Sequence, residues 1–199
     1  MKRNAISFSR RMTSFSASSG NTLNRKEVVR IMVKIRQGMF ETNSSSTHTI
    51  IVTDKNCEPC VIVDFAIGEF GWERSCLTTV DDKASYLYTM GCYVLERDIY
   101  QDLYEILCKY GVKCTCSVPA VFDKEHHWLD NGYVDHGGDG DSMKFVEDML
   151  SHEKLLIRYL FSPDSFVVTG NDNCGENDYE WYRSKTDVDY KHKEYYKGN

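Results

Sequence analysis

The order of strand-like and helix-like segments along the chain constrains its fold most. Segments rich in β-branched residues predict strands, and apolar residues at helical spacing between them predict helices. The order is strands, two helices, a strand, a polar loop, one or two helices and a last strand, which predicts an α+β fold, with helices packed on one face of an antiparallel or mixed sheet. The first two confident strands, on either side of a turn at 54–59, are expected to form a hairpin. The expected strands are 33–37, 49–53, 60–65, 112–116 and 165–169. Of the expected helices, the first begins at Asp81 or Asp82, the second covers 97–110, the third begins at Ser142, and the fourth, or a continuation of the third, covers 155–160.

Charge and hydropathy exclude several classes of protein. The 199 residues carry a formal net charge of −6, and an acidic chain is a poor default for binding nucleic acid, where phosphate contacts need clustered Lys and Arg. The apolar runs are too short to span a bilayer, so no membrane association is expected. Eight Cys are present without a secretory signal at the N-terminus, which favours reduced thiols in a cytoplasm.

The two ends differ in composition from the centre. Residues 1–31 are basic and Ser-rich, and we interpret them as a leader outside the fold. Residues 26–29 can be encoded by AAG GAG GTG GTG, which contains a bacterial ribosome-binding sequence, so Met32 rather than Met1 is the start codon that we expect. A single globular domain is predicted over 32–177, and the charged, Tyr-rich segment 178–199 is predicted to be a peripheral tail.

The first candidate site is the polar run from Thr42 to His48, which leads directly into a strand. Its hydroxyls and backbone N–H groups can hold an anion such as phosphate, and His48 can serve as a general acid or base at neutral pH. The alternative is a Ser/Thr turn with a histidine at the start of a strand. The ligand-binding candidates from this run are Asn43, Ser44, Ser45 and Ser46.

The second candidate lies in the long polar loop 119–141, where three His and two Asp occur between 126 and 136. Imidazole and carboxylate groups are ligands of divalent metals. We select His127, Asp135 and His136 as a tentative metal set, although their spacing matches no zinc signature. The alternative is a solvated polar loop.

Two cysteine pairs, Cys57 with Cys60 and Cys114 with Cys116, raise the possibility of structural zinc. The second pair has a single intervening residue instead of two. We place its two side chains on opposite faces of a strand, so buried free thiols, or a redox-inactive pair, are the preferred interpretation.

The last candidate follows the final predicted strand. Asn171, Asp172 and Asn173 have side chains that suit a turn, but loops at strand ends also line ligand sites. We therefore include these three residues among the ligand-binding candidates.

The segment Phe40-Glu41-Thr42-Asn43-Ser44-Ser45-Ser46-Thr47-His48 resembles a family of small bacteriophage and bacterial proteins that carry FETNSSSTH near their first Met. The segments 133–136 and 169–173 also look similar to that family. The resemblance supplies no activity, but it implies that Met32 is the start and that the three polar segments belong to one site.

Taken together, the sequence predicts a small phage-type cytoplasmic enzyme acting on a phosphate-bearing or nucleotide ligand. His48, Asp135 and His136 are the expected catalytic residues, meeting the 171–173 segment at one edge of the sheet, with a divalent ion as possible cofactor. The alternative is a non-enzymatic phage protein that binds or inhibits a host protein, since an acidic surface with many Tyr suits protein recognition.

Overall fold

A computed structural model describes residues 46–60, 62–135, 137–138, 140–171 and 192–197. Every described residue belongs to one compact unit within 41–199. The expected leader, the strand at 33–37 and the candidate residues Asn43, Ser44, Ser45, His136, Asp172 and Asn173 lie outside the described residues.

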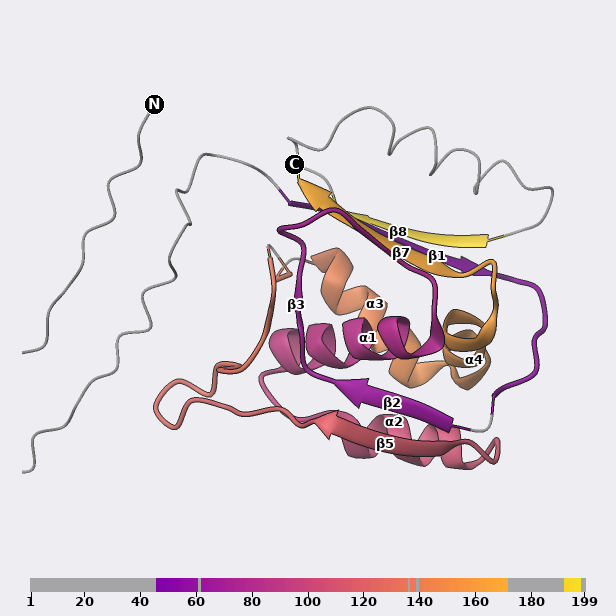
Figure 1. Ribbon diagram of the computed structural model, residues 1–199, viewed down its shortest axis with the longest axis horizontal. Helices are drawn as coiled ribbons and strands as arrows, with labels where there is room; N and C mark the ends of the chain where they lie inside the picture. Colours follow the sequence, from indigo (N-terminus) through magenta and orange to yellow (C-terminus); the bar gives the residue numbers. More distant parts are fainter. Residues whose placement is uncertain (1–45, 61, 136, 139, 172–191, 198–199) are drawn as a thin grey trace, which may run out of the picture. The chain divides into compact units, whose positions relative to one another are not determined.

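The described residues have an α+β fold (Figure 1). An antiparallel sheet has the strand order β4-β7-β1-β8, and two shorter parallel pairs join β2 with β5 and β3 with β6. The strands are β1 (Ser46–Thr53), β2 (Ile62–Ala66), β3 (Glu69–Phe70), β4 (Ser75–Leu77), β5 (Lys113–Val118), β6 (Tyr133–Val134), β7 (Phe166–Asn171) and β8 (His192–Lys197). The helices are α1 (Val80–Leu95), α2 (Tyr100–Cys108), α3 (Gly140–Ser151) and α4 (Glu153–Phe161).

The helices form a layer beside the antiparallel sheet, as expected. In Figure 1, α1, α3 and α4 lie between that sheet and the β2–β5 pair, and α2 packs against β5. Ile50, Val167 and Tyr195 are register partners on β1, β7 and β8, so their side chains share the face that meets the helices. All three are at most 5% exposed and belong to the main core.

The expected hairpin between the first two strands is wrong. β2 pairs in parallel with β5, and its other edge is covered by α1. Residues two apart in a strand and residues four apart in a helix are both separated by about 6–7 Å. One helix face can therefore satisfy alternate N–H groups of a strand. The side-chain oxygens of Asp81, Ser85 and Thr89 accept hydrogen bonds from the backbone N–H groups of Asp64, Ala66 and Gly68, at 3.0, 3.2 and 3.0 Å respectively.

The end of the predicted tail is also part of the fold. Residues 192–197 form β8, which pairs antiparallel with β1. Tyr195 is 5% exposed and donates its hydroxyl to the Asp148 carboxylate of α3, which also binds Lys193. Burial raises the pKa of Asp148, but the hydrogen bonds from Lys193 and Tyr195 outweigh burial, so the pKa of Asp148 is lowered overall. The tail prediction missed this strand because a charged, Tyr-rich segment has no apolar period of its own.

Helix starts differ from the sequence predictions by a few residues. Thr79, not Asp81 or Asp82, caps α1, because its hydroxyl oxygen accepts a hydrogen bond from the Asp82 backbone N–H. Ser142 lies inside α3 and is 4% exposed, so it is not the cap that we expected.

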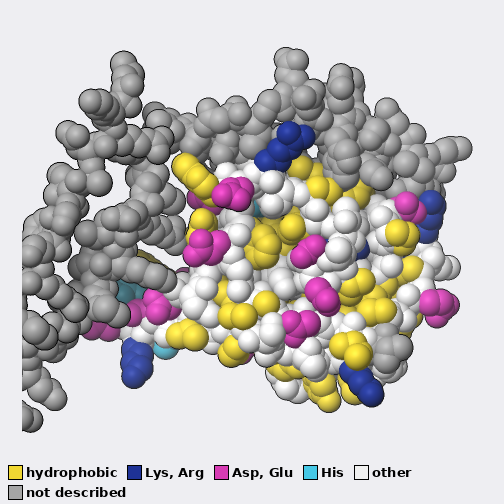
Figure 2. Space-filling view, viewed as in Figure 1, with side chains coloured by type: hydrophobic (Ala, Val, Ile, Leu, Met, Phe, Trp, Pro, Cys, Tyr) yellow, Lys and Arg dark blue, Asp and Glu magenta, His cyan; other side chains and the backbone are white. Residues whose placement is uncertain are grey.

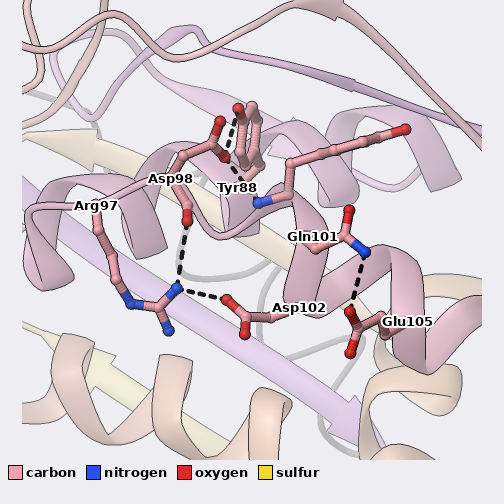
Figure 3. Close-up of polar contacts among 7 residues, drawn as sticks. Tyr88, Arg97, Asp98, Gln101, Asp102 and Glu105 are labelled. Carbon is pink, nitrogen blue, oxygen red and sulfur yellow. Dashed lines mark hydrogen bonds and ion pairs between the residues drawn. The ribbon is translucent and has the colours of Figure 1, made fainter.

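The connection from α1 to α2 is fixed by Asp98 (Figure 3). Its carboxylate accepts hydrogen bonds from the Tyr100 backbone N–H at 2.8 Å and from the Tyr88 hydroxyl at 3.0 Å. Arg97 points to the other side of this turn and pairs with Asp102 at 2.5 Å. Because Asp98 satisfies the first N–H of the helix, α2 begins at Tyr100 rather than at residue 97.

The two cysteines of β5 share a face, which corrects their placement on opposite faces. Residues two apart in a strand point to the same side, and Cys114 and Cys116 both pack against the core. The thiol of Cys57 donates to the Ile157 carbonyl oxygen, and that of Cys60 donates to the Ile62 carbonyl oxygen. All four thiols are free, but Cys60 is exposed and the other three are half-buried, so the preferred interpretation of buried thiols overstated their enclosure.

Candidate functional site

Residues from the three polar segments meet where β1 begins and β7 ends. Ser46 and Asn171 are register partners, and His48 is the partner of Thr169 two residues further along. The His48 ring reaches Asp135, which follows β6. These residues lie at the end of the central strand pair, β1 and β7, and not at the sheet edge that we expected. In the order β4-β7-β1-β8, both strands have a neighbour on each side.

The His48 ring is buried at this junction, at 2% exposure. Nε2 lies 2.9 Å from the backbone carbonyl oxygen of Asp135, and a carbonyl only accepts, so Nε2 carries a proton. Nδ1 lies 3.1 Å from the Tyr86 hydroxyl of α1, which donates to it when the ring is neutral. The imidazole therefore joins a strand, a helix and a loop, and both its nitrogens are engaged.

Gly71 allows the chain to pass directly over this imidazole. Its φ is +107°, a conformation that only glycine adopts readily. A Cβ at this position would lie 2.8 Å from Cε1 and Nε2 of His48 and 2.9 Å from Cβ of Asp135. The loop after β3 is thus fitted to the buried ring.

A cavity of about 310 Å³ opens beside this junction. Its walls come from β3, β4 and the loop between them, from β6 and from β7. Thr169, the register partner of His48, is 1% exposed and donates its hydroxyl to the Glu73 carbonyl oxygen, which holds the loop against β7. We call this cavity the Trp72 pocket, and its lining residues are Glu69, Phe70, Gly71, Trp72, Glu73, Ser75, Tyr133 and Thr169.

The Trp72 pocket is anionic and aromatic. Glu69 and Glu73 are exposed, and within the described part of the chain neither carboxylate makes a hydrogen bond or an ion pair. Trp72, Phe70 and Tyr133 supply aromatic surface. The lining drawn from the described residues includes no Lys or Arg, since the neighbouring Arg74 is not part of it. Such a lining attracts a cationic group and repels phosphate.

The tentative metal set stays a prediction, because His136 lies outside the described residues. His127 is exposed, in the left-handed region at φ 59°, and Asp135 is half-buried beside His48. Within the described ranges, no group of three or more His, Cys, Asp or Glu side chains is arranged to hold a metal ion.

Sequence reasoning missed the pocket residues and one buried cation. Glu69, Trp72 and Glu73 resemble an ordinary loop in sequence, although Gly71 beside Trp72 was a usable signal of a close backbone approach. Lys83 is 1% exposed and donates to the carbonyl oxygens of Ser162 and Ser165, each at 2.9 Å. Burial lowers the pKa of Lys83 to about 8, partly offset by the nearby Cys57 thiol. Lys83 precedes those two carbonyl groups by 79 and 82 residues in the sequence, so no local pattern could reveal the contact.

Comparisons with protein families, with curated proteins and with solved structures found no match to this chain. The described helices include none with the length and hydropathy of a membrane span. The site's geometry is therefore the basis for a functional proposal.

Proposed function

We propose that this chain is a non-enzymatic recognition protein whose Trp72 pocket binds a basic side chain, Arg or Lys, of a protein partner. The observation that carries the proposal is the lining of that pocket, in which two carboxylates without a partner among the described residues stand beside aromatic rings. A guanidinium or ammonium group stacks on Trp or Tyr faces and pairs with carboxylates. Its site of action is the cytoplasm of a bacterial host.

The surface charge supports a basic partner. The chain carries a net charge of −6. On the face that Figure 2 shows, Asp and Glu side chains are spread across the surface, while Lys and Arg side chains lie toward its margin. An acidic surface of this kind accelerates encounter with a basic protein and discourages nucleic acid.

The competing proposal is the enzyme acting on a phosphate-bearing or nucleotide ligand. It loses support at two points: His48 is buried with both nitrogens engaged, and the pocket beside it is anionic. A general base must reach the proton that it abstracts, which this imidazole does not do without movement of its neighbours. His136 is then the acid or base on which the enzyme proposal depends.

The test is a titration of the ¹⁵N-labelled protein with N-acetyl-L-arginine amide, followed by NMR. Cation–π contacts contribute roughly 0.5–2 kcal/mol and exposed ion pairs roughly 0.2–1 kcal/mol each, so a single side chain should bind with a Kd of about 10 mM. We expect the Gly71 amide and the Trp72 indole signals to shift. The double variant Glu69→Gln/Glu73→Gln should abolish the shifts.

The matched control is Glu58→Gln/Glu147→Gln, which removes two exposed carboxylates outside the pocket and should leave binding unchanged. N-acetyl-L-glutamine amide, which has no charge, should not bind. If adenosine monophosphate shifts these signals and the arginine amide does not, the recognition proposal fails and the enzyme proposal is supported.

A further inference from the structure

Trp128 has the largest exposed fraction among the large apolar side chains of the described residues, at 64%. It is not loosely held, because the His126 ring stacks on it with centroids 4.8 Å apart and an interplanar angle of 27°. An ordered indole facing solvent is the kind of residue that dominates protein interfaces.

The segment that carries Trp128 is a braced hairpin. Phe122 and Leu129 form an antiparallel bridge and pack against the core. The Asp123 backbone N–H donates to the Trp128 carbonyl oxygen at 2.8 Å, and its carboxylate accepts from the His126 backbone N–H at 2.7 Å. Asn131 joins the two arms, since its amide bonds both the Val121 N–H and the Pro119 carbonyl oxygen, each at 2.9 Å.

The indole forms one wall of a second cavity, of about 500 Å³, which we call the Trp128 groove. The opposite walls come from the end of α1 and the start of α3. Tyr93, which is 38% exposed, lies against the backbone at Gly137 and Gly138, where a Cβ would approach its ring to 3.2 and 3.8 Å. The lining residues are Tyr93, Val94, Glu96, Trp128, Leu129, Gly138 and Met143.

We infer that the Trp128 groove is a second docking site, which takes a large apolar side chain of a basic segment in a partner protein. The apolar anchor follows from the lining, in which Glu96 is the only carboxylate that the described residues supply. The basic flank follows from charge complementarity. Within the described ranges the carboxylate of Glu96 has no hydrogen-bond or ion-pair partner, and the hairpin adds Asp123, Glu125 and Asp130 against a single lysine, Lys124.

This inference deepens the proposed function, because both sites recognise a basic protein, but it rests on a separate cavity. The segment 119–138 joins them, since Tyr133 lines the Trp72 pocket while Trp128, Leu129 and Gly138 line the groove. Bracing the hairpin before binding reduces the entropy lost on association.

The test is selection of short random peptides displayed on phage against the full chain, followed by affinity measurement on the selected sequences. We expect a consensus with one large apolar residue flanked by Lys or Arg. Truncation of a central Trp typically weakens binding by about thirtyfold, so Trp128→Ala should weaken the selected peptides by about that factor. Glu96→Gln should weaken them by about threefold, as loss of one exposed charge pair does.

The matched control is Tyr104→Ala, which removes an aromatic side chain that is also 38% exposed but lies on α2, outside the groove. It should leave affinity unchanged, and so should Glu69→Gln/Glu73→Gln, which separates the groove from the Trp72 pocket. Selection of no peptide, a consensus without an apolar residue, or affinity unaffected by Trp128→Ala would each overturn the inference. A dimer of this chain that Trp128→Ala dissociates would also overturn it, since the groove would then hold a second copy.

Discussion

Two buried polar junctions hold α1 in place, and they differ in charge. The imidazole junction, formed by Tyr86, His48, Asp135 and Gly71, links the helix to β1 and to the loop after β3. The ammonium junction, formed by Lys83, Ser162 and Ser165, links its first turns to the connection between α4 and β7. Lys83 is 1% exposed and His48 is 2% exposed, so burial alone does not distinguish them.

The difference lies in what each junction requires from its surroundings. A neutral imidazole needs one donor and one acceptor at fixed positions, and a close backbone approach that only glycine permits. A buried ammonium needs acceptors but loses its hydration, and the lowered pKa of Lys83, about 8, reports that cost. The imidazole junction should therefore be sensitive to shape and the ammonium junction to pH.

The largest effect is expected for His48→Ala. The change leaves the Asp135 carbonyl oxygen and the Tyr86 hydroxyl without the ring and opens a cavity, which together should lower the free energy of unfolding by about 4 kcal/mol. Urea denaturation measures it. The control is His126→Ala, at an exposed ring, with an expected loss below about 0.5 kcal/mol. A similarly small loss at His48 would remove the structural role and restore His48 as a catalytic candidate.

The next effect compares two glycines in the left-handed region. Gly71→Ala should lower the free energy of unfolding by about 3 kcal/mol, because the new Cβ meets His48 and Asp135 in addition to the backbone strain. At Gly111, with φ +75°, a Cβ would have nothing within 4 Å, so Gly111→Ala should cost only about 1 kcal/mol. Equal losses in the two variants would show that the contact with the imidazole contributes nothing.

The last effect is the pH dependence of the ammonium junction. The pKa of Lys83 is about 8 in the folded chain against 10.5 as its ordinary value, so between these pH values the unfolded chain binds more protons. The contribution of Lys83 to stability therefore rises with pH, by up to about 3 kcal/mol across that window. Burial raises the pKa of the thiols of Cys92 and Cys114 to about 12 and about 11, which lowers stability above about pH 9.

Because those thiols oppose the lysine, the measurement is the difference between the natural chain and Lys83→Met at each pH. Subtraction removes the contributions of Cys92 and Cys114, on which Lys83 has no direct influence. The difference should move in favour of the natural chain as pH rises from about 8 to 10.5. A difference that stays constant over this range would mean that the ammonium is not desolvated in solution.

The sequence predicted the local elements better than their partners. The β-branched run at 49–53 and the apolar spacing in 155–160 identified β1 and α4, because these signals reside in neighbouring residues. The pairing of β2 depends on β5, about fifty residues later, and on the acceptor side chains of α1, neither of which leaves a local pattern. β8 was missed for the same reason, since its burial is supplied by β1 and Asp148.

The meeting of the polar segments was predictable from the sequence, but its place in the sheet and its chemistry were not. The polar residues around His48, Asp135 and Asn171 marked a convergence of three segments, and the structure brings parts of all three together. Residue type did not reveal that the imidazole is enclosed, because enclosure depends on Gly71 and Tyr86 from other elements. The anionic lining also comes from β3 and the loop that follows it, which carry no recognisable motif.

The hydrogen bonding of α1 to the edge of β2 that faces away from β5 restricts how this chain can change in length. Asp81, Ser85 and Thr89 accept hydrogen bonds from alternate N–H groups of the strand. One residue inserted between 81 and 89 would rotate part of the helix by about 100° and break at least one of these three hydrogen bonds. A length change between the end of β4 and Thr79 leaves that spacing intact. Among relatives of this chain, insertions should therefore be tolerated between β4 and Thr79 and be absent from the first three turns of α1.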